Sequence, residues 1–139
     1  MKYFKITEFE TSAMAVQKKI DNSIPKDKKR NWEYLTDKVL DPIREKYGKP
    51  IHVNSGYRCT QLNTLLGGAP TSQHLGDNAA AADITGGSPA ENKKIFDVAK
   101  QLMEAGKIEF DQLIDESNLQ WVHIGIKINR NQILYIKAK

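Results

Sequence analysis

The chain has 139 residues, close to the commonest size of a single domain, and 40% of them are hydrophobic. Its net charge is +4, but the basic residues are spread along the chain, and no array of basic and aromatic residues predicts a nucleic-acid surface. The only cysteine, Cys59, excludes an internal disulfide. We therefore expect one globular domain over residues 1–139, monomeric and without a nucleic-acid partner.

The sequence contains no apolar run of signal-peptide length at its N-terminus and none of transmembrane length elsewhere. We therefore expect synthesis in the cytoplasm, no membrane insertion, and delivery to any other compartment by a separate route.

The front third has helical patterns. Thr7 and Glu10 have capping-box spacing and predict the start of a short helix. Asn31 is a candidate N-cap and Gly48 a stop signal for a second helix, and Pro42 predicts a kink or a break inside it. The apolar residues that recur there at helical spacing are Trp32, Leu35, Val39, Leu40, Ile43 and Tyr47.

The basic run "KDKKR" at residues 26–30 precedes that helix, and we interpret it as a solvated loop. A third helix has clearer limits. Ser88 is its N-cap, Pro89 occupies the first helical position and Glu91 has capping-box spacing, while Gly106 ends it. Its apolar face consists of Ile95, Phe96, Ala99, Leu102 and Met103.

The back half has strand patterns. The predicted strands are residues 51–54, 80–85, 110–115, 121–128 and 132–137. Residues 129–131 favour a turn that joins the last two strands as a hairpin. The expected fold class is α+β, a mainly antiparallel sheet with N-terminal helices and one inserted helix.

Alternation along the fourth strand separates two faces. Val122, Ile124, Ile126 and Ile128 share one face, which we expect to pack on the helices. Trp121, His123, Gly125 and Lys127 share the other face, and Gly125 leaves room above the sheet.

The second strand presents an acid in the same way. Ala82 and Ile84 point inward, so Asp83 points to the opposite side and can meet His123 there, with His74 arriving from a loop. Two imidazoles and a carboxylate suit a zinc ion that keeps a fourth position for water. Hydrogen-bonded polar residues without a metal are the alternative. His52, between two apolar residues, is interpreted as structural.

The segments "SGYRC", "GG", "SQH", "AAADI", "FDQLI" and "WVHI" together resemble the zinc D-Ala-D-Ala carboxypeptidase family. Its relatives include D-alanyl-D-alanine dipeptidases, phage endolysins that cut peptide stems, and the Hedgehog signalling domain. The resemblance covers almost the whole chain and is strongest to the small bacterial and phage subgroup. It implies a Hedgehog/DD-peptidase-like zinc peptidase fold.

The resemblance also implies site residues. His74, Asp83 and His123 match the metal ligands, with one Zn²⁺ per chain. Arg58 matches the residue that holds a substrate carboxylate or carbonyl and stabilises developing negative charge. Further substrate-binding positions are Ser72, Gln73 and Trp121.

This sequence departs from the family pattern at two places. Eight residues separate His74 from Asp83 where relatives commonly have six, which makes Asp77 a rival ligand. Several relatives have an acidic general base three residues before the last histidine, where this chain has Gln120, and an amide cannot take a proton at neutral pH. Glu116 is then our first candidate for the base and Asp115 the second.

These residues predict a zinc peptidase that cuts peptidoglycan stem peptides, as a carboxypeptidase or an endopeptidase, by metal-activated water. The alternative is a non-catalytic zinc domain that binds cell-wall peptide or a protein partner. Without a signal peptide, we expect the chain to reach the wall by phage-type or lytic release.

Overall fold

The computed structural model describes residues 1–127 and 132–135. Five strands form one sheet, namely β1 (His52–Ser55), β2 (Ala80–Thr85), β3 (Gln112–Glu116), β4 (Trp121–Ile126) and β5 (Gln132–Tyr135). The helical elements are η1 (Ile6–Phe9), α1 (Ala13–Gln17), α2 (Lys26–Leu35), the π-helical η2 (Thr36–Leu40), α3 (Asp41–Tyr47), α4 (Thr60–Leu65), η3 (Gln73–Leu75) and α5 (Pro89–Glu104).

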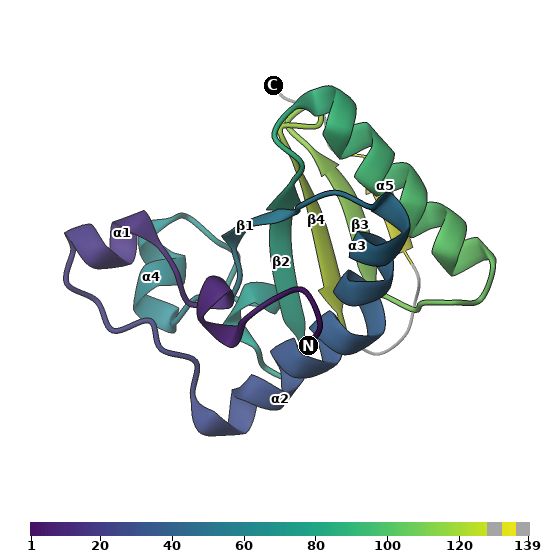
Figure 1. Ribbon diagram of the computed structural model, residues 1–139. Helices are drawn as coiled ribbons and strands as arrows, with labels where there is room; N and C mark the ends of the chain where they lie inside the picture. Colours follow the sequence, from purple (N-terminus) through teal and green to yellow (C-terminus); the bar gives the residue numbers. More distant parts are fainter. Residues whose placement is uncertain (128–131, 136–139) are drawn as a thin grey trace.

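The sheet has the order β1-β2-β4-β3-β5, and β3–β5 is its parallel pair while the others are antiparallel. Helix α5 lies across one face of the sheet, with α3 beside it (Figure 1). The core forms between them, because Ala82, Ile84, Val122 and Ile124 point to the side on which Ile95, Phe96 and Ala99 of α5 are buried. The predicted α+β class is confirmed.

Helix α2 begins earlier than the sequence patterns predict. It starts after Pro25, and the backbone carbonyl of Pro25 accepts hydrogen bonds from the N–H groups of Lys28 and Lys29. The basic run at residues 26–30 is therefore helical, and both the solvated-loop interpretation and the N-cap at Asn31 are wrong. The earlier start of α2 places Lys28 and Asn31 on this helix, where their side chains bind the loop that carries His74.

The break predicted at Pro42 takes the form of a π-turn. The backbone N–H of Asp41 donates to the carbonyl of Thr36, five residues earlier, and α3 then starts with Pro42 in its first turn. Proline lacks the N–H that a continuous α-helix would need at that position. Gly48, with φ of +81°, ends α3 as expected.

Two of the capping predictions differ in detail. The first short helix is the 3-10 turn η1, in which the Glu8 carboxylate accepts from the backbone N–H of Lys5; the predicted Thr7–Glu10 pair is wrong by two residues. Ser88 caps α5 as predicted, by accepting from the backbone N–H of Glu91. The predicted capping box of Ser88 and Glu91 does not form, because the Glu91 carboxylate binds Tyr47 and Lys49 instead of the backbone N–H of Ser88.

All five predicted strands exist, but the last connection is wrong. Strand β5 pairs with β3 in parallel, and β3 lies between β4 and β5, so β4 and β5 form no hairpin. The predicted turn at residues 129–131, the inward position of Ile128 and the end of the last strand after residue 135 lie outside the described residues.

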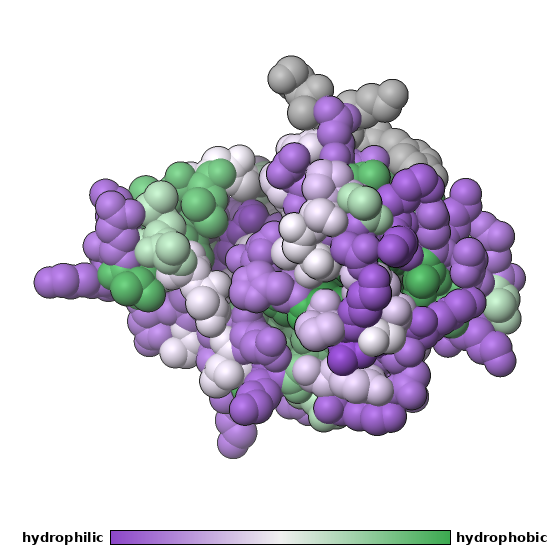
Figure 2. Space-filling model, turned by 45° about the horizontal axis from the view of Figure 1, so that its top comes forward, coloured by the Kyte–Doolittle hydropathy of each residue, from purple (hydrophilic) through white to green (hydrophobic). Residues whose placement is uncertain are grey.

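The face shown in Figure 2 is mainly hydrophilic, with a hydrophobic patch at its left, over the part of the molecule where Figure 1 places α1 and α4. Exposed apolar side chains of these helices or next to them are Val16, Leu65 and Leu66. None of the described helices has the length and apolar character needed to span a bilayer.

Candidate metal centre

A short turn positions His74. Ser72 precedes it, and the Ser72 Oγ accepts a hydrogen bond from the backbone N–H of His74 at 3.2 Å. Helix α2 then holds the following residues, because Lys28 Nζ donates to the carbonyl of Leu75 at 2.8 Å and the Asn31 amide donates to the carbonyl of Gly76 at 3.1 Å. The loop is thereby fixed from both sides, and His74 is buried.

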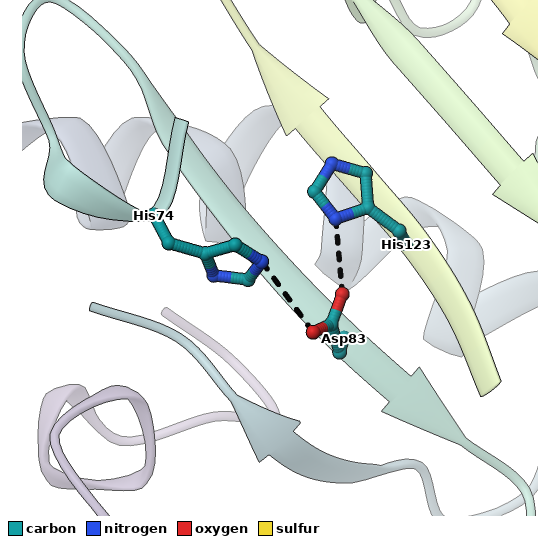
Figure 3. A group of neighbouring side chains, drawn as sticks. All are labelled: His74, Asp83 and His123. Carbon is teal, nitrogen blue, oxygen red and sulfur yellow. Dashed lines mark hydrogen bonds and ion pairs between the residues drawn. The ribbon is translucent and has the colours of Figure 1, made fainter. Parts of the chain in front are cut away.

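Sheet register positions the other two residues. Asp83 of β2 lies directly opposite His123 of β4 in an antiparallel pair, so both side chains point to the face away from α5. His123 Nδ1 lies 2.9 Å from Asp83 Oδ1, and His74 Nε2 lies 3.4 Å from Asp83 Oδ2 (Figure 3). Asp83 is at the centre of the group and both histidine rings are directed at it.

The three side chains fit a divalent cation. One donor atom from each of them lies within 4.8 Å of the others. With metal–ligand distances of about 2.0–2.1 Å, two ligands of a tetrahedral zinc stand roughly 3.3 Å apart, and the two contacts of Asp83, at 2.9 and 3.4 Å, are close to that value. His74 Nδ1 lies 2.6 Å from the carbonyl of Gly56, to which it donates, so Nε2 keeps its lone pair toward Asp83.

The carboxylate is held in its ionised form. Burial by itself would raise the pKa of Asp83, but the contacts with His123 and His74 outweigh burial and keep the pKa well below the usual range. An ionised acid between two imidazoles is the form that a metal cation requires.

Asp77, the alternative metal ligand in the sequence, does not lie with the two histidines. Asp77 Oδ1 lies 3.1 Å from Lys28 Nζ, and the Asp77 side chain is 76% exposed. Residues 76–79 connect η3 to β2, and Asp83 lies within β2. Asp83, rather than Asp77, lies with the two histidines.

A cleft of about 650 Å³ opens over the three residues. Arg58 forms part of its wall, with Nη2 3.7 Å from Asp83 Oδ2 and Nε donating to Ser55 Oγ at 3.3 Å. The backbone N–H of Arg58 also donates to the carbonyl of His74. Buried Asn22 binds the backbone on both sides of Arg58, at the Tyr57 carbonyl and the Cys59 N–H.

The two candidate bases point in opposite directions. Glu116 pairs with Trp121 across β3 and β4 and lines the cleft, on the same face as His123. Burial raises the pKa of the Glu116 carboxyl above its ordinary value. Asp115 is one residue earlier in the strand, and its carboxylate accepts from the backbone N–H of Leu119 at 2.6 Å, outside the cleft-lining set. Gln120 is exposed in the turn.

The turn after Glu116 has an unusual backbone. Ser117, Asn118 and Leu119 all have positive φ, between 49° and 64°, which is costly for residues other than glycine. Asn92 of α5, 1% exposed, stabilises it by donating to the carbonyls of Leu119 and Gln120. The turn aligns Glu116 with Trp121, and no motif marked Asn92 in the sequence.

Other predicted substrate positions also line the cleft, namely Ser72, Gln73 and Trp121. Sequence reasoning missed Asp111, whose carboxylate accepts from the Gln73 amide at 2.5 Å.

The space expected above Gly125 is filled by Gln73, because a Cβ on this glycine would collide with Gln73 Oε1. His52 is exposed and does not line this cleft.

A family model described as peptidase M15 matches residues 2–125, which is most of the chain and includes all three residues of the candidate centre. The chain belongs to the M15 peptidase family. No curated protein matches it. Membership agrees with the α+β fold and with a metal centre of two histidines and one aspartate, because M15 enzymes are zinc peptidases. For this M15 peptidase, the classification supports a metallopeptidase and hence a peptide substrate.

Proposed function

We propose that this M15 peptidase hydrolyses peptide bonds in the stem peptides of peptidoglycan, with His74, Asp83 and His123 holding one zinc ion. The observation that carries the proposal is the position of Glu116, an acid in the same cleft and on the same sheet face as the three candidate ligands. Zinc, when bound, supplies an activated water and polarises the scissile carbonyl.

Glu116 is the proposed general base. Its half-buried carboxylate accepts the proton of the attacking water and passes it to the leaving amine. A pKa raised by burial makes the carboxylate a better acceptor than an exposed acid. Asp115 is not suited to this role, because its carboxylate holds the turn at Leu119.

Arg58 is the proposed electrophilic residue. Its guanidinium stays ionised and its Nη2 lies next to Asp83, where it can stabilise the developing oxyanion or anchor a terminal carboxylate. Ser72, Gln73 and Trp121 form the walls on which the peptide lies. Gly67, Gly68 and Ala69 also line the cleft, and we propose that these small residues admit an extended peptide.

The test is digestion of purified sacculi by the zinc-loaded protein, followed by mass spectrometry of the soluble fragments. We expect fragments with new termini inside the stem peptides, and their masses identify the bond. Glu116→Gln should lower the rate by about 10²–10⁴-fold while one zinc per chain is retained. Asp115→Asn is the matched control, and it should stay within a few-fold of the wild-type rate.

Two results would contradict the proposal. An active Glu116→Gln variant would remove the base role from Glu116, and hydrolysis that survives His74→Ala would exclude the metal mechanism. Binding to sacculi without any released fragment would instead favour a zinc domain that recognises wall peptide. If stem peptides are the substrate, we propose that the chain reaches the wall by phage-type or lytic release.

A further inference from the structure

Two buried polar atoms in one wall of the cleft have no hydrogen-bond partner. They are Oε1 of Gln73 and Nε2 of His123; among the side chains of the described residues, only Asn63 Oδ1 shares this property. Both residues are buried, with exposed fractions of 9% and 8%. A buried polar group without a hydrogen-bond partner is destabilising, so two of them next to a proposed metal centre require an explanation.

The Gln73 amide has a fixed orientation. Its Nε2 donates to the Asp111 carboxylate at 2.5 Å, and a carboxylate accepts hydrogen bonds but cannot donate them. The amide oxygen must therefore point the other way, over Gly125, where the absence of a side chain makes room for it. Asp111 is fully buried, and its backbone N–H donates to the carbonyl of Gly125.

The His123 ring points toward the same place. Its Nδ1 faces Asp83, while Nε2 is directed away from Asp83 and along β4 toward the end of that strand (Figure 3). Gly125 lies two residues further along β4, on the same face as His123. The unpaired nitrogen of His123 and the unpaired oxygen of Gln73 therefore lie on the same face of β4, two residues apart along the strand.

The tautomer of the His123 ring determines whether Nε2 is a hydrogen-bond donor or an acceptor. In the contact with Asp83, Nδ1 donates, so Nε2 of the neutral ring has a lone pair and no partner. A cation bound through Nδ1 needs the lone pair of that nitrogen, and the ring proton must then reside on Nε2. In that tautomer Nε2–H is a hydrogen-bond donor that needs an acceptor, and Gln73 Oε1 is the unpaired acceptor on the same face of β4.

We infer that Gln73, oriented by Asp111, accepts the Nε2–H of His123 when His123 binds the metal, and so positions this ring. The inference rests on the metal site of the proposed function but not on its substrate. It makes Gln73 a positioning residue, because it acts on the metal centre through the His123 ring. His74 has a fixed acceptor in Gly56, and this assignment gives His123 the corresponding one.

The first experiment uses nuclear magnetic resonance of the wild-type protein labelled with ¹⁵N-histidine. We expect His123 Nε2 to be unprotonated without metal and to carry a slowly exchanging proton after zinc is added. A proton that exchanges rapidly with solvent in the zinc-loaded protein, or a loaded ring protonated at Nδ1, would overturn the inference. No peptidase activity is needed for this measurement.

The second experiment measures zinc affinity by competition with a chelator. Gln73→Leu keeps the approximate volume but removes the acceptor, and we expect its affinity to fall by about 10–100-fold. Gln112→Leu is the matched control, since Gln112 also lines the cleft and lies opposite Gly125 on β3. Its affinity should equal that of the wild type.

Wild-type affinity of Gln73→Leu would contradict the inference, as would an equal loss in Gln112→Leu. Circular dichroism of both variants shows whether they fold. If Gln73→Leu does not fold, the ¹⁵N spectrum of the wild-type protein still tests whether His123 Nε2–H forms a hydrogen bond in the zinc-loaded state. Failure of the peptidoglycan assay alone would refute the proposed substrate and leave the hydrogen bond between His123 and Gln73 intact.

Discussion

Among the individual residues, the two aspartates near His74 are a direct test of the metal centre. Asp83 is buried between two imidazoles, whereas Asp77 is exposed and pairs with Lys28. An exposed ion pair of this kind contributes little to stability, roughly 0–1 kcal/mol. Substitution of Asp83 therefore tests the loss of a metal ligand, whereas the same substitution of Asp77 tests only the loss of a surface charge.

We predict that Asp83→Asn reduces bound zinc from about one per chain to nearly none after dialysis, because a neutral amide is a poor zinc ligand. Asp77→Asn should keep the full metal content. Elemental analysis of both proteins, purified without chelator, makes the comparison. Equal zinc in the two variants would mean that Asp83 is not a ligand.

Much of the centre could be predicted from residue order and strand parity. The position of Asp83 in an Ala-rich strand and of His123 between Val122 and Ile124 placed both on the face opposite the core. The choice between Glu116 and Asp115 was harder, because adjacent strand residues face opposite sides and a one-residue shift exchanges them. Only the pairing of Glu116 with Trp121 decides which one enters the cleft.

At the scale of elements, α5 links the core to the cleft. Its apolar residues pack on the sheet, while Asn92 near its start binds the turn before β4 and also accepts from the backbone N–H of Gly86 after β2. The start of α5 thus fixes the ends of two strands that carry candidate metal ligands. We therefore expect that destabilising the start of α5 would disturb the positions of Asp83 and His123.

The contribution of the α5 N-cap to stability can be measured by substituting Ser88. Ser88→Ala removes the cap on the Glu91 N–H and should lower the free energy of unfolding by about 1 kcal/mol, within a range of 0.5–2 kcal/mol. Ser88→Asp keeps an acceptor at the N-cap and should retain most of the stability. Urea denaturation followed by circular dichroism measures both, and equal loss in the two variants would show that the cap is not the cause.

For the molecule as a whole, a polar network joins the N-terminal helices to α5. The Glu91 carboxylate accepts from Lys49 Nζ at 2.8 Å and from the Tyr47 hydroxyl at 2.5 Å, and it also binds Lys94. These hydrogen bonds, chiefly the one from Lys49, lower the pKa of Glu91 to about 2. The end of α3 is thereby tied to the start of α5.

This network gives the fold a defined acid sensitivity. A carboxyl whose pKa is lower in the folded state stabilises the fold above its unfolded pKa and loses that contribution as the pH falls to the folded value. For Glu91 the window runs from its ordinary value of 4.5 down to about 2. Glu91→Gln should therefore show a smaller fall in melting temperature between pH 5 and about pH 2. Identical pH dependence in both proteins would contradict this assignment.

The sequence by itself determined the fold class, the five strands and the cap of α5, because these depend on local patterns of period and capping. Strand parity and the family resemblance suggested His74, Asp83 and His123 as metal ligands but left Asp77 as an alternative to Asp83. Only the tertiary structure decided that β5 lies beside β3, that α2 begins at Lys26 to hold the His74 loop, and that Gln73 pairs with Asp111. The reason is physical. Each of these contacts joins segments distant in the chain, and strand register and burial select such partners in ways that local patterns do not encode.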